Sequence, residues 1–319
     1  MRIEGGLQDE WRGAFSLEEG VVVKGIVIGL FAIGFSILMI SSVATPASAV
    51  IGQDDGDGHP YVGLMAYQPV ENGPWYITPG GSATLVSADV AVTAGHVIAL
   101  PPEGPSFFFG FHPHAMGVVF HPTPFDISAT PDPDAVADYP LGFILREISE
   151  DDVHKATPFV NPDFGSHASG SGRILGDVGV LVFDEPVSGP TATISSEQTA
   201  GELLRQVRAG GGKITLVGYG AGEFRPPSFP GDGRRRVADL TVKEITNGEL
   251  WAWRRAETDG GGAPGDSGSP AFLKGTSIVV GVLSTGTFES QIVTGFSRVG
   301  STSACQFLAD FLDDLSCSQ

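Results

Sequence analysis

The stretch that decides the fold runs from Gly260 to Pro270 and reads GGGAPGDSGSP. At its centre, Ser267 lies between Gly265-Asp266 and Gly268. Glycine permits tight turns and close backbone approach, so a serine in this setting can sit where N–H groups point at a substrate. Because the chain contains 45 glycines, the loop taken alone is equally consistent with a structural turn.

Two other segments supply the partners that a nucleophilic serine requires. The apolar run 90–95 ends on His96, and imidazole titrates in the range that suits a general base. Asp177 opens the apolar run 178–183, where a carboxylate needs hydrogen bonds, and orienting a catalytic imidazole is one use for it. Taken singly, each residue also fits a structural role.

In the order His96, Asp177, Ser267, the three segments resemble the chymotrypsin/trypsin-like serine protease family at each catalytic motif. The residues TAGH at 93–96 are similar to the family's TAAHC box, DVGVL at 177–181 to its DIAL box, and GDSGSP at 265–270 to its GDSGGP box. Further similarities are VGYG at 217–220, NPDF at 161–164 and STG at 284–286. The α/β-hydrolase order of serine, acid and histidine is excluded, because all seven histidines precede Ser267.

The resemblance implies an all-β fold of two six-stranded antiparallel Greek-key barrels followed by a C-terminal helix, which the apolar spacing places at 307–315. It also implies a serine endopeptidase that forms an acyl-enzyme, with His96 as the base, Asp177 as its orienting acid and Ser267 as the nucleophile. Val97 replaces the family's usual cysteine, and its other bridges are missing, so the chain resembles the bacterial secreted members most.

Other site residues follow from the same resemblance. The N–H groups of Gly265 and Ser267 are expected to form the oxyanion hole, and Ser284, Thr285 and Gly286 to pair with substrate. Gly261 is expected at the base of the specificity pocket, which predicts a preference for small or apolar side chains, although a shifted loop would present Asp259 instead.

The composition agrees with an all-β enzyme or binding protein. The chain has 319 residues, and its 45 glycines and 23 prolines beside only 17% charged residues predict short elements and many turns. A net charge of -19 argues against nucleic acid as a partner. The only cysteines, Cys305 and Cys317, permit one disulfide in an oxidising compartment or remain two free thiols.

The domain organisation is predicted from strand-like segments separated by Gly, Pro, Asn and Asp. We expect one barrel at 50–190, a boundary near 188–200, and a second barrel with the terminal helix at 191–319. The intervening region 101–158 shows no sustained periodicity and is interpreted as an insertion made of loops.

Residues 1–49 have the pattern of a signal peptide, with an uncharged core at 26–40 and an Ala47-Ser48-Ala49 cleavage site. We therefore expect a secreted or periplasmic protein; a retained anchor and a translation start near 21–23 are the alternatives. Cleavage after Ala49 would expose Val50-Ile51-Gly52, which resembles the family's mature terminus and implies that Val50 pairs with Asp266.

No cofactor or metal is expected. His112, His114 and His121 lack a matching cysteine or HExxH helix, and the loop carrying Asp54, Asp55 and Asp57 lacks the EF-hand pattern. The expected partners are polypeptide substrates, with no stable membrane partner after signal cleavage, and the sequence indicates no oligomeric state. The alternative function is a catalytically silent binding or adhesion protein with the protease fold.

Overall fold

The computed structural model describes residues 53–99, 113–122, 146–165, 175–220, 232–253, 260–288 and 292–317. The predicted signal peptide and Val50 lie outside these ranges. Across the ranges that are described, no helix is both long and apolar enough to span a membrane.

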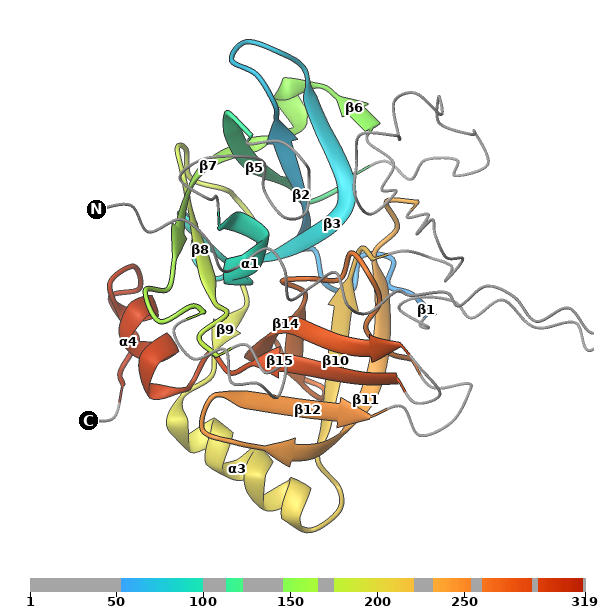
Figure 1. The fold of residues 1–319 in the computed structure, drawn as a ribbon, viewed down its shortest axis with the longest axis vertical. Coiled ribbons are helices and arrows are strands. Elements are labelled where there is room, and N and C mark those ends of the chain that lie inside the picture. The colour runs from blue at the N-terminus through green and yellow to red at the C-terminus, as the bar shows by residue number, and fades with distance from the viewer. Residues whose placement is uncertain are drawn as a thin grey trace, which may run out of the picture. The chain divides into compact units, whose positions relative to one another are not determined.

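The first barrel is a closed antiparallel sheet in the N-terminal half (Figure 1). Six strands follow the order β2-β5-β7-β8-β4-β3, and the pairing of β2 with β3 closes the ring. Their bounds are β2 (Val62–Gln68), β3 (Trp75–Leu85), β4 (Val90–Thr93), β5 (Ala115–Val119), β7 (His154–Val160) and β8 (Gly179–Phe183). A further short strand, β6 (Arg146–Ile148), extends the sheet beside β3.

The second barrel closes in the same way, through the pairing of β11 with β12. Its six strands are β10 (Lys213–Gly218), β11 (Arg236–Ile245), β12 (Glu249–Trp253), β13 (Pro270–Leu273), β14 (Ile278–Phe288) and β15 (Ile292–Ser297). Two short strands from the N-terminal side join it, because β1 (Gln53–Asp54) pairs with β11 and β9 (Thr193–Ile194) pairs with β14.

The prediction that 101–158 is an insertion of loops is wrong for the part that the structure describes. This region contains β5, β6, the short 3₁₀ helix η2 (Glu150–Asp152) and the first five residues of β7. Met116 and Val118 are buried, and β5 pairs with both β2 and β7, so the segment completes the first barrel. The strands are too short for a period to be recognised, and β5 is buried along nearly its whole length, which removes the alternation.

The helices also differ from the sequence prediction. A helix over 197–208 was not expected, yet Ser196 caps α3 (Glu197–Arg208), whose Leu203 is buried against the second barrel. The C-terminal helix α4 (Thr302–Ala309) begins five residues before the predicted 307–315 and ends earlier. Its start is set by Ser301, whose Oγ accepts a hydrogen bond from the backbone N–H of Ala304.

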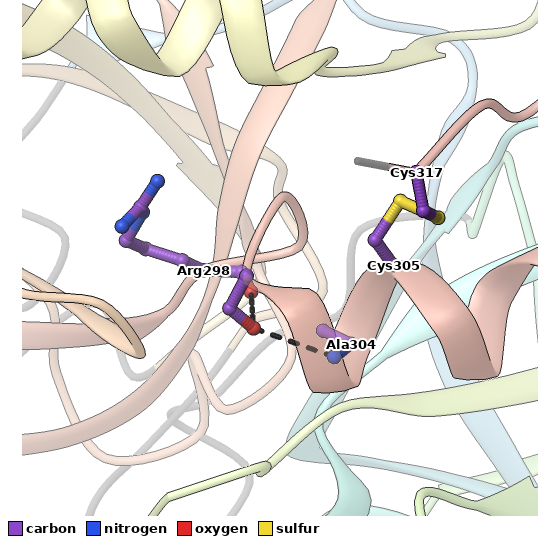
Figure 2. The surroundings of a disulfide bond; sticks show 5 residues. Arg298, Ala304, Cys305 and Cys317 are labelled. Atoms are coloured by element: carbon purple, nitrogen blue, oxygen red, sulfur yellow. Dashed lines mark hydrogen bonds between the residues drawn. A yellow bond between two sulfur atoms is a disulfide. The ribbon is translucent and has the colours of Figure 1, made fainter. Parts of the chain in front are cut away.

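The two cysteines form a disulfide between α4 and the segment that follows it (Figure 2). The pairing of Cys305 with Cys317 decides against two free thiols. A disulfide is consistent with an extracytoplasmic location.

The two barrels share one apolar core where they meet. Buried residues of the first barrel form a continuous cluster with Tyr219, Phe272 and Val282 of the second barrel and with Phe307 and Leu308 of α4. Groups presented at this junction by the two barrels are therefore held in a fixed relation by close packing.

Candidate active site

His96 and Asp177 form a hydrogen-bonded pair at the edge of the first barrel, with Asp177 buried and His96 partly buried. His96 lies in the single turn α1 (Gly95–Ile98), which follows β4, while Asp177 lies just before β8, the strand that pairs with β4. The distance from His96 Nδ1 to Asp177 Oδ2 is 2.6 Å. The backbone N–H of His96 donates to the other carboxylate oxygen at 2.7 Å. With Nδ1 donating to the carboxylate, Nε2 is the nitrogen that can accept a proton.

The second barrel contributes one more donor to this carboxylate. Ser284 of β14 donates from its Oγ to Asp177 Oδ2 at 2.5 Å. Asp177 is fully buried, and its hydrogen bonds compensate the cost of removing a carboxylate from water. Ser284 was predicted only to pair with substrate, and nothing in the sequence pattern indicated that its hydroxyl would hold Asp177.

The serine loop, defined here as residues 263–269, is fastened to both barrels by backbone hydrogen bonds. On one side, the N–H of Ser82 in β3 donates to the carbonyl of Ser267 at 2.8 Å. On the other side, Gly268 donates to Leu283 at 2.9 Å, and Leu283 donates back to Ser269 at 2.8 Å. Leu283 immediately precedes Ser284, so the loop is tied to the strand that contacts Asp177.

Gly268 brings the serine loop directly against the segment that carries His96. Its φ of +77° is in the left-handed region, and a Cβ there would lie 2.2 Å from Thr93 Oγ1 and 3.0 Å from the backbone nitrogen of Ala94. Only glycine fits this conformation at this distance. The half-buried Ser267 is therefore placed beside the chain that leads into His96.

Two backbone N–H groups of the serine loop have no acceptor among the described residues: those of Gly265 and Ser267. The amides around them are satisfied, because Asp266 donates to the carbonyl of Ala263 and Ser269 to that of Asp266, both at 2.9 Å. Gly265 has a φ of +94°, which an ordinary residue rarely adopts. Two unsatisfied donors beside a serine are what an oxyanion hole requires.

Asp266, within the serine loop, is fully buried. Its Oδ1 accepts a hydrogen bond from the N–H of Gly220 at 2.7 Å, and its Oδ2 accepts one from Ala263 at 2.9 Å. The predicted partner Val50 lies outside the described residues.

The predicted substrate-binding residues lie on β14 next to these groups. Thr285 and Gly286 pair with Gly295 and Thr294 of β15. Among the described strands, the opposite edge of β14 is paired only as far as Val282, so residues 284–286 present an edge that an extended peptide can join.

Gly261 is buried near these residues and carries no carboxylate. The next amide, of Gly262, donates to Thr294 Oγ1 at 3.1 Å, so a buried threonine side chain adjoins the expected base of the pocket. Asp259, the alternative charged group, lies outside the described residues.

Comparison with known proteins bears on the fold alone. No protein-family model matches the chain. No curated protein matches it either. Among solved structures, the chain is similar to HL collagenase, with a TM-score of 0.52 and 14% sequence identity over 81% of this chain and 96% of the collagenase. Two closed six-stranded antiparallel barrels and a C-terminal helix give the chain the trypsin-like serine protease fold.

Proposed function

We propose that the chain is an exported serine endopeptidase that hydrolyses peptide bonds through His96, Asp177 and Ser267. The observation that carries this proposal is the pair of unsatisfied N–H groups at Gly265 and Ser267, in a loop packed against the chain that leads into His96. A structural turn has no need of two such donors around a serine.

The mechanism follows from the roles that the geometry supports. His96 Nε2 removes the proton from Ser267 Oγ as the oxygen attacks the peptide carbonyl carbon, and the resulting oxyanion accepts hydrogen bonds from Gly265 and Ser267. The protonated imidazole then gives its proton to the leaving nitrogen as the C–N bond breaks, so the amine product departs and the acyl group stays on Ser267 as the acyl-enzyme. Water, activated by the same nitrogen, releases the second product and restores Ser267. Asp177 stabilises the imidazolium and fixes its orientation throughout.

Substrate binding is proposed at the β14 edge, with residues 284–286 pairing to an extended peptide backbone. The base of the specificity pocket at Gly261 offers no negative charge, and burying an unpaired lysine or arginine there is costly. Thr294, which adjoins Gly262, occupies space near that base. Together these features favour small or apolar side chains before the cleaved bond.

Activation is proposed to follow from export itself, because signal cleavage after Ala49 would free the amino group of Val50 to pair with Asp266. The register of β1 supports this pairing of Val50 with Asp266. Gln53 pairs with Val237, which in turn pairs with Val217 near the Asp266 pocket. Two strand spacings separate Gln53 from Val217 by roughly 10 Å. Three extended residues span about the same distance, which supports the proposed pairing of Val50 with Asp266.

The function is tested by incubating the chain that begins at Val50 with a peptide library and identifying the cleaved bonds by mass spectrometry. We expect cleavage after small or apolar residues, and none by the Ser267→Ala variant. Absence of cleavage would contradict the proposed activity. A clear Lys or Arg preference would contradict only the proposed pocket.

The activation step is tested separately by determining the terminus of the secreted protein and by adding one alanine before Val50. We expect the secreted chain to begin at Val50 and the extended chain to have sharply reduced activity. Undiminished activity of the extended chain would remove the role of the Val50 amino group.

A further inference from the structure

A buried ion-pair cluster lies at the back of the serine loop and has no part in the mechanism above. It consists of Asp55, His59, Tyr219 and Arg235, and we call it the arginine junction. The side chains of Asp55 and Arg235 are only 2% and 6% exposed. A charge buried this deeply is retained only with close partners, so the cluster needs a physical reason.

The guanidinium of Arg235 joins three separate parts of the chain. Its Nε donates to Asp55 Oδ2 at 2.7 Å and its Nη2 to the carbonyl of Gly56 at 2.7 Å, both in the segment that precedes the first barrel. Its Nη1 lies 3.2 Å from the carbonyl of Val62 at the start of β2 and 3.3 Å from the hydroxyl of Tyr219. One planar group thus fixes the N-terminal segment, the first barrel and the second barrel together.

Asp55 is held from a second side by His59. The carboxylate accepts hydrogen bonds from His59 Nδ1 at 2.6 Å and from its backbone N–H at 2.9 Å. Burial by itself would raise the pKa of Asp55, but the hydrogen bonds from His59 and Arg235 outweigh it and hold the pKa below its usual range. The His59 ring stacks on Phe272 of β13, the strand that follows the serine loop.

Tyr219 connects the arginine junction to the serine loop. Its hydroxyl accepts a hydrogen bond from Arg235 Nη1. The next residue, Gly220, donates its backbone N–H to the Asp266 carboxylate at 2.7 Å. The backbone N–H of Tyr219 also contacts Ser82 Oγ at 3.4 Å. Ser82 in turn holds the carbonyl of Ser267. The guanidinium is therefore linked to Asp266 through two hydrogen bonds and to Ser267 through three.

We propose that Arg235 is a positioning residue for the serine loop. By fastening the segment 53–60 and the first barrel to Tyr219, it keeps Gly220 and Ser82 in place against the loop. The N–H groups of Gly265 and Ser267 are aligned as a result. This inference rests on the proposed peptidase activity, in which those two groups stabilise the oxyanion.

The test compares Arg235→Ala with a control that weakens the fold elsewhere. Leu203→Ala serves as that control, because Leu203 is buried between α3 and the second barrel and is not part of the site. Since small misplacements of catalytic groups cost about 100-fold, we expect kcat of Arg235→Ala to fall about 30- to 100-fold with KM within about 3-fold of wild type. Leu203→Ala should lower the melting temperature and leave kcat unchanged.

A second readout reports on the oxyanion hole directly. The affinity for a peptide boronate, which resembles the tetrahedral intermediate, should fall in Arg235→Ala in parallel with kcat/KM.

A surface hollow of about 270 Å³ is lined in part by Tyr219 and Arg235, so added guanidinium ion can reach the vacated position. We expect millimolar guanidinium to restore part of kcat in Arg235→Ala and to have no such effect on Leu203→Ala.

The outcomes separate the two proposals. Wild-type protein that cleaves no peptide contradicts the proposed function. With an active wild type, kcat of Arg235→Ala within about 3-fold of it, or an equal loss in Leu203→Ala, overturns the positioning role. If Arg235→Ala does not fold, the same measurements are made on Arg235→Lys and judged by the same criterion. Lysine keeps the positive charge but lacks the planar set of N–H donors of the guanidinium.

Discussion

The two sides of the candidate active site are fixed by different kinds of contact. On the first barrel, the imidazole of His96 is held by a side-chain carboxylate, which also accepts hydrogen bonds from the His96 backbone and from Ser284. On the second barrel, the serine loop is held by backbone hydrogen bonds to Ser82 and Leu283 and by glycine conformations.

This difference predicts which kind of substitution disturbs each side of the candidate site. Removing one side chain is enough to disturb the orientation of His96, whereas the serine loop is displaced by an added Cβ at a closely packed glycine such as Gly268. In our proposal the serine loop also depends on the arginine junction, which lies behind it. The following predictions test this contrast from the largest expected effect to the smallest.

Removing the reactive groups on either side should have the same large effect. We expect Ser267→Ala and His96→Ala each to lower kcat by about 10⁶-fold, and the double variant by little more, because the groups act as a unit. Steady-state kinetics on one peptide substrate measure all three. Near-normal turnover by Ser267→Ala would show that the nucleophile is a different residue.

An added methyl group at Gly268 should displace the backbone of the serine loop. In Gly268→Ala the new Cβ would lie 2.2 Å from Thr93 Oγ1 at a φ of +77°. We expect kcat to fall at least about 100-fold through displacement of the loop.

Gly275→Ala is the matched control, because Gly275 has a φ of +78° and nothing within 4 Å of the added Cβ. It should cost about 1 to 2 kcal/mol of stability from strain alone and leave kcat unchanged. Equal kcat losses in the two variants would contradict the role given to close packing at Gly268.

Loss of one hydrogen-bond donor to Asp177 should lower kcat moderately. Ser284→Ala removes the hydroxyl that bonds Asp177 Oδ2, while the two bonds from His96 remain. One net hydrogen bond to a charged group is worth about 1.5 to 3 kcal/mol, so we expect kcat to fall about 10- to 100-fold with intact folding. Unchanged kcat would show that the barrel-to-barrel bond is dispensable for catalysis.

Acid should remove the stabilisation that the Asp55 carboxylate gives to the arginine junction. The pKa of Asp55 is lowered in the folded chain, so its contribution to stability is present above the unfolded value of 3.8 and is lost as pH falls through the folded value. We expect Asp55→Asn to reduce the loss of stability between pH 5 and 2 by about 1.4 kcal/mol for each unit of pKa shift removed. Denaturant unfolding at several pH values across this range measures the free energy of unfolding. An equal loss of stability in wild type and Asp55→Asn would contradict the prediction.

The motifs of the candidate site could be found in the sequence because the proposed chemistry requires particular residue types at particular places. Ser267, His96 and Asp177 each carry a local signature, and Gly265 and Gly268 were recognisable as residues that permit close approach. The strand β5 and the helix α3 were missed, since a short, almost fully buried strand shows no alternation and Leu203 and Val207 give a narrow apolar stripe.

The supporting contacts could not be predicted from the sequence for a different reason. Ser284 meets Asp177 across 107 residues, and Arg235 meets Asp55 across 180 residues. Such contacts are created only when the two barrels close and pack, and serine and arginine are ordinary surface residues in a sequence.

The most direct test of the central claim is labelling with a fluorophosphonate, followed by peptide mapping of the modified residue. The reagent reacts with a serine only when a base and an oxyanion hole activate it. We predict one adduct, located on Ser267, in the chain that begins at Val50, and no adduct in the folded His96→Ala variant. An adduct on another residue, or equal labelling of His96→Ala, would contradict the account.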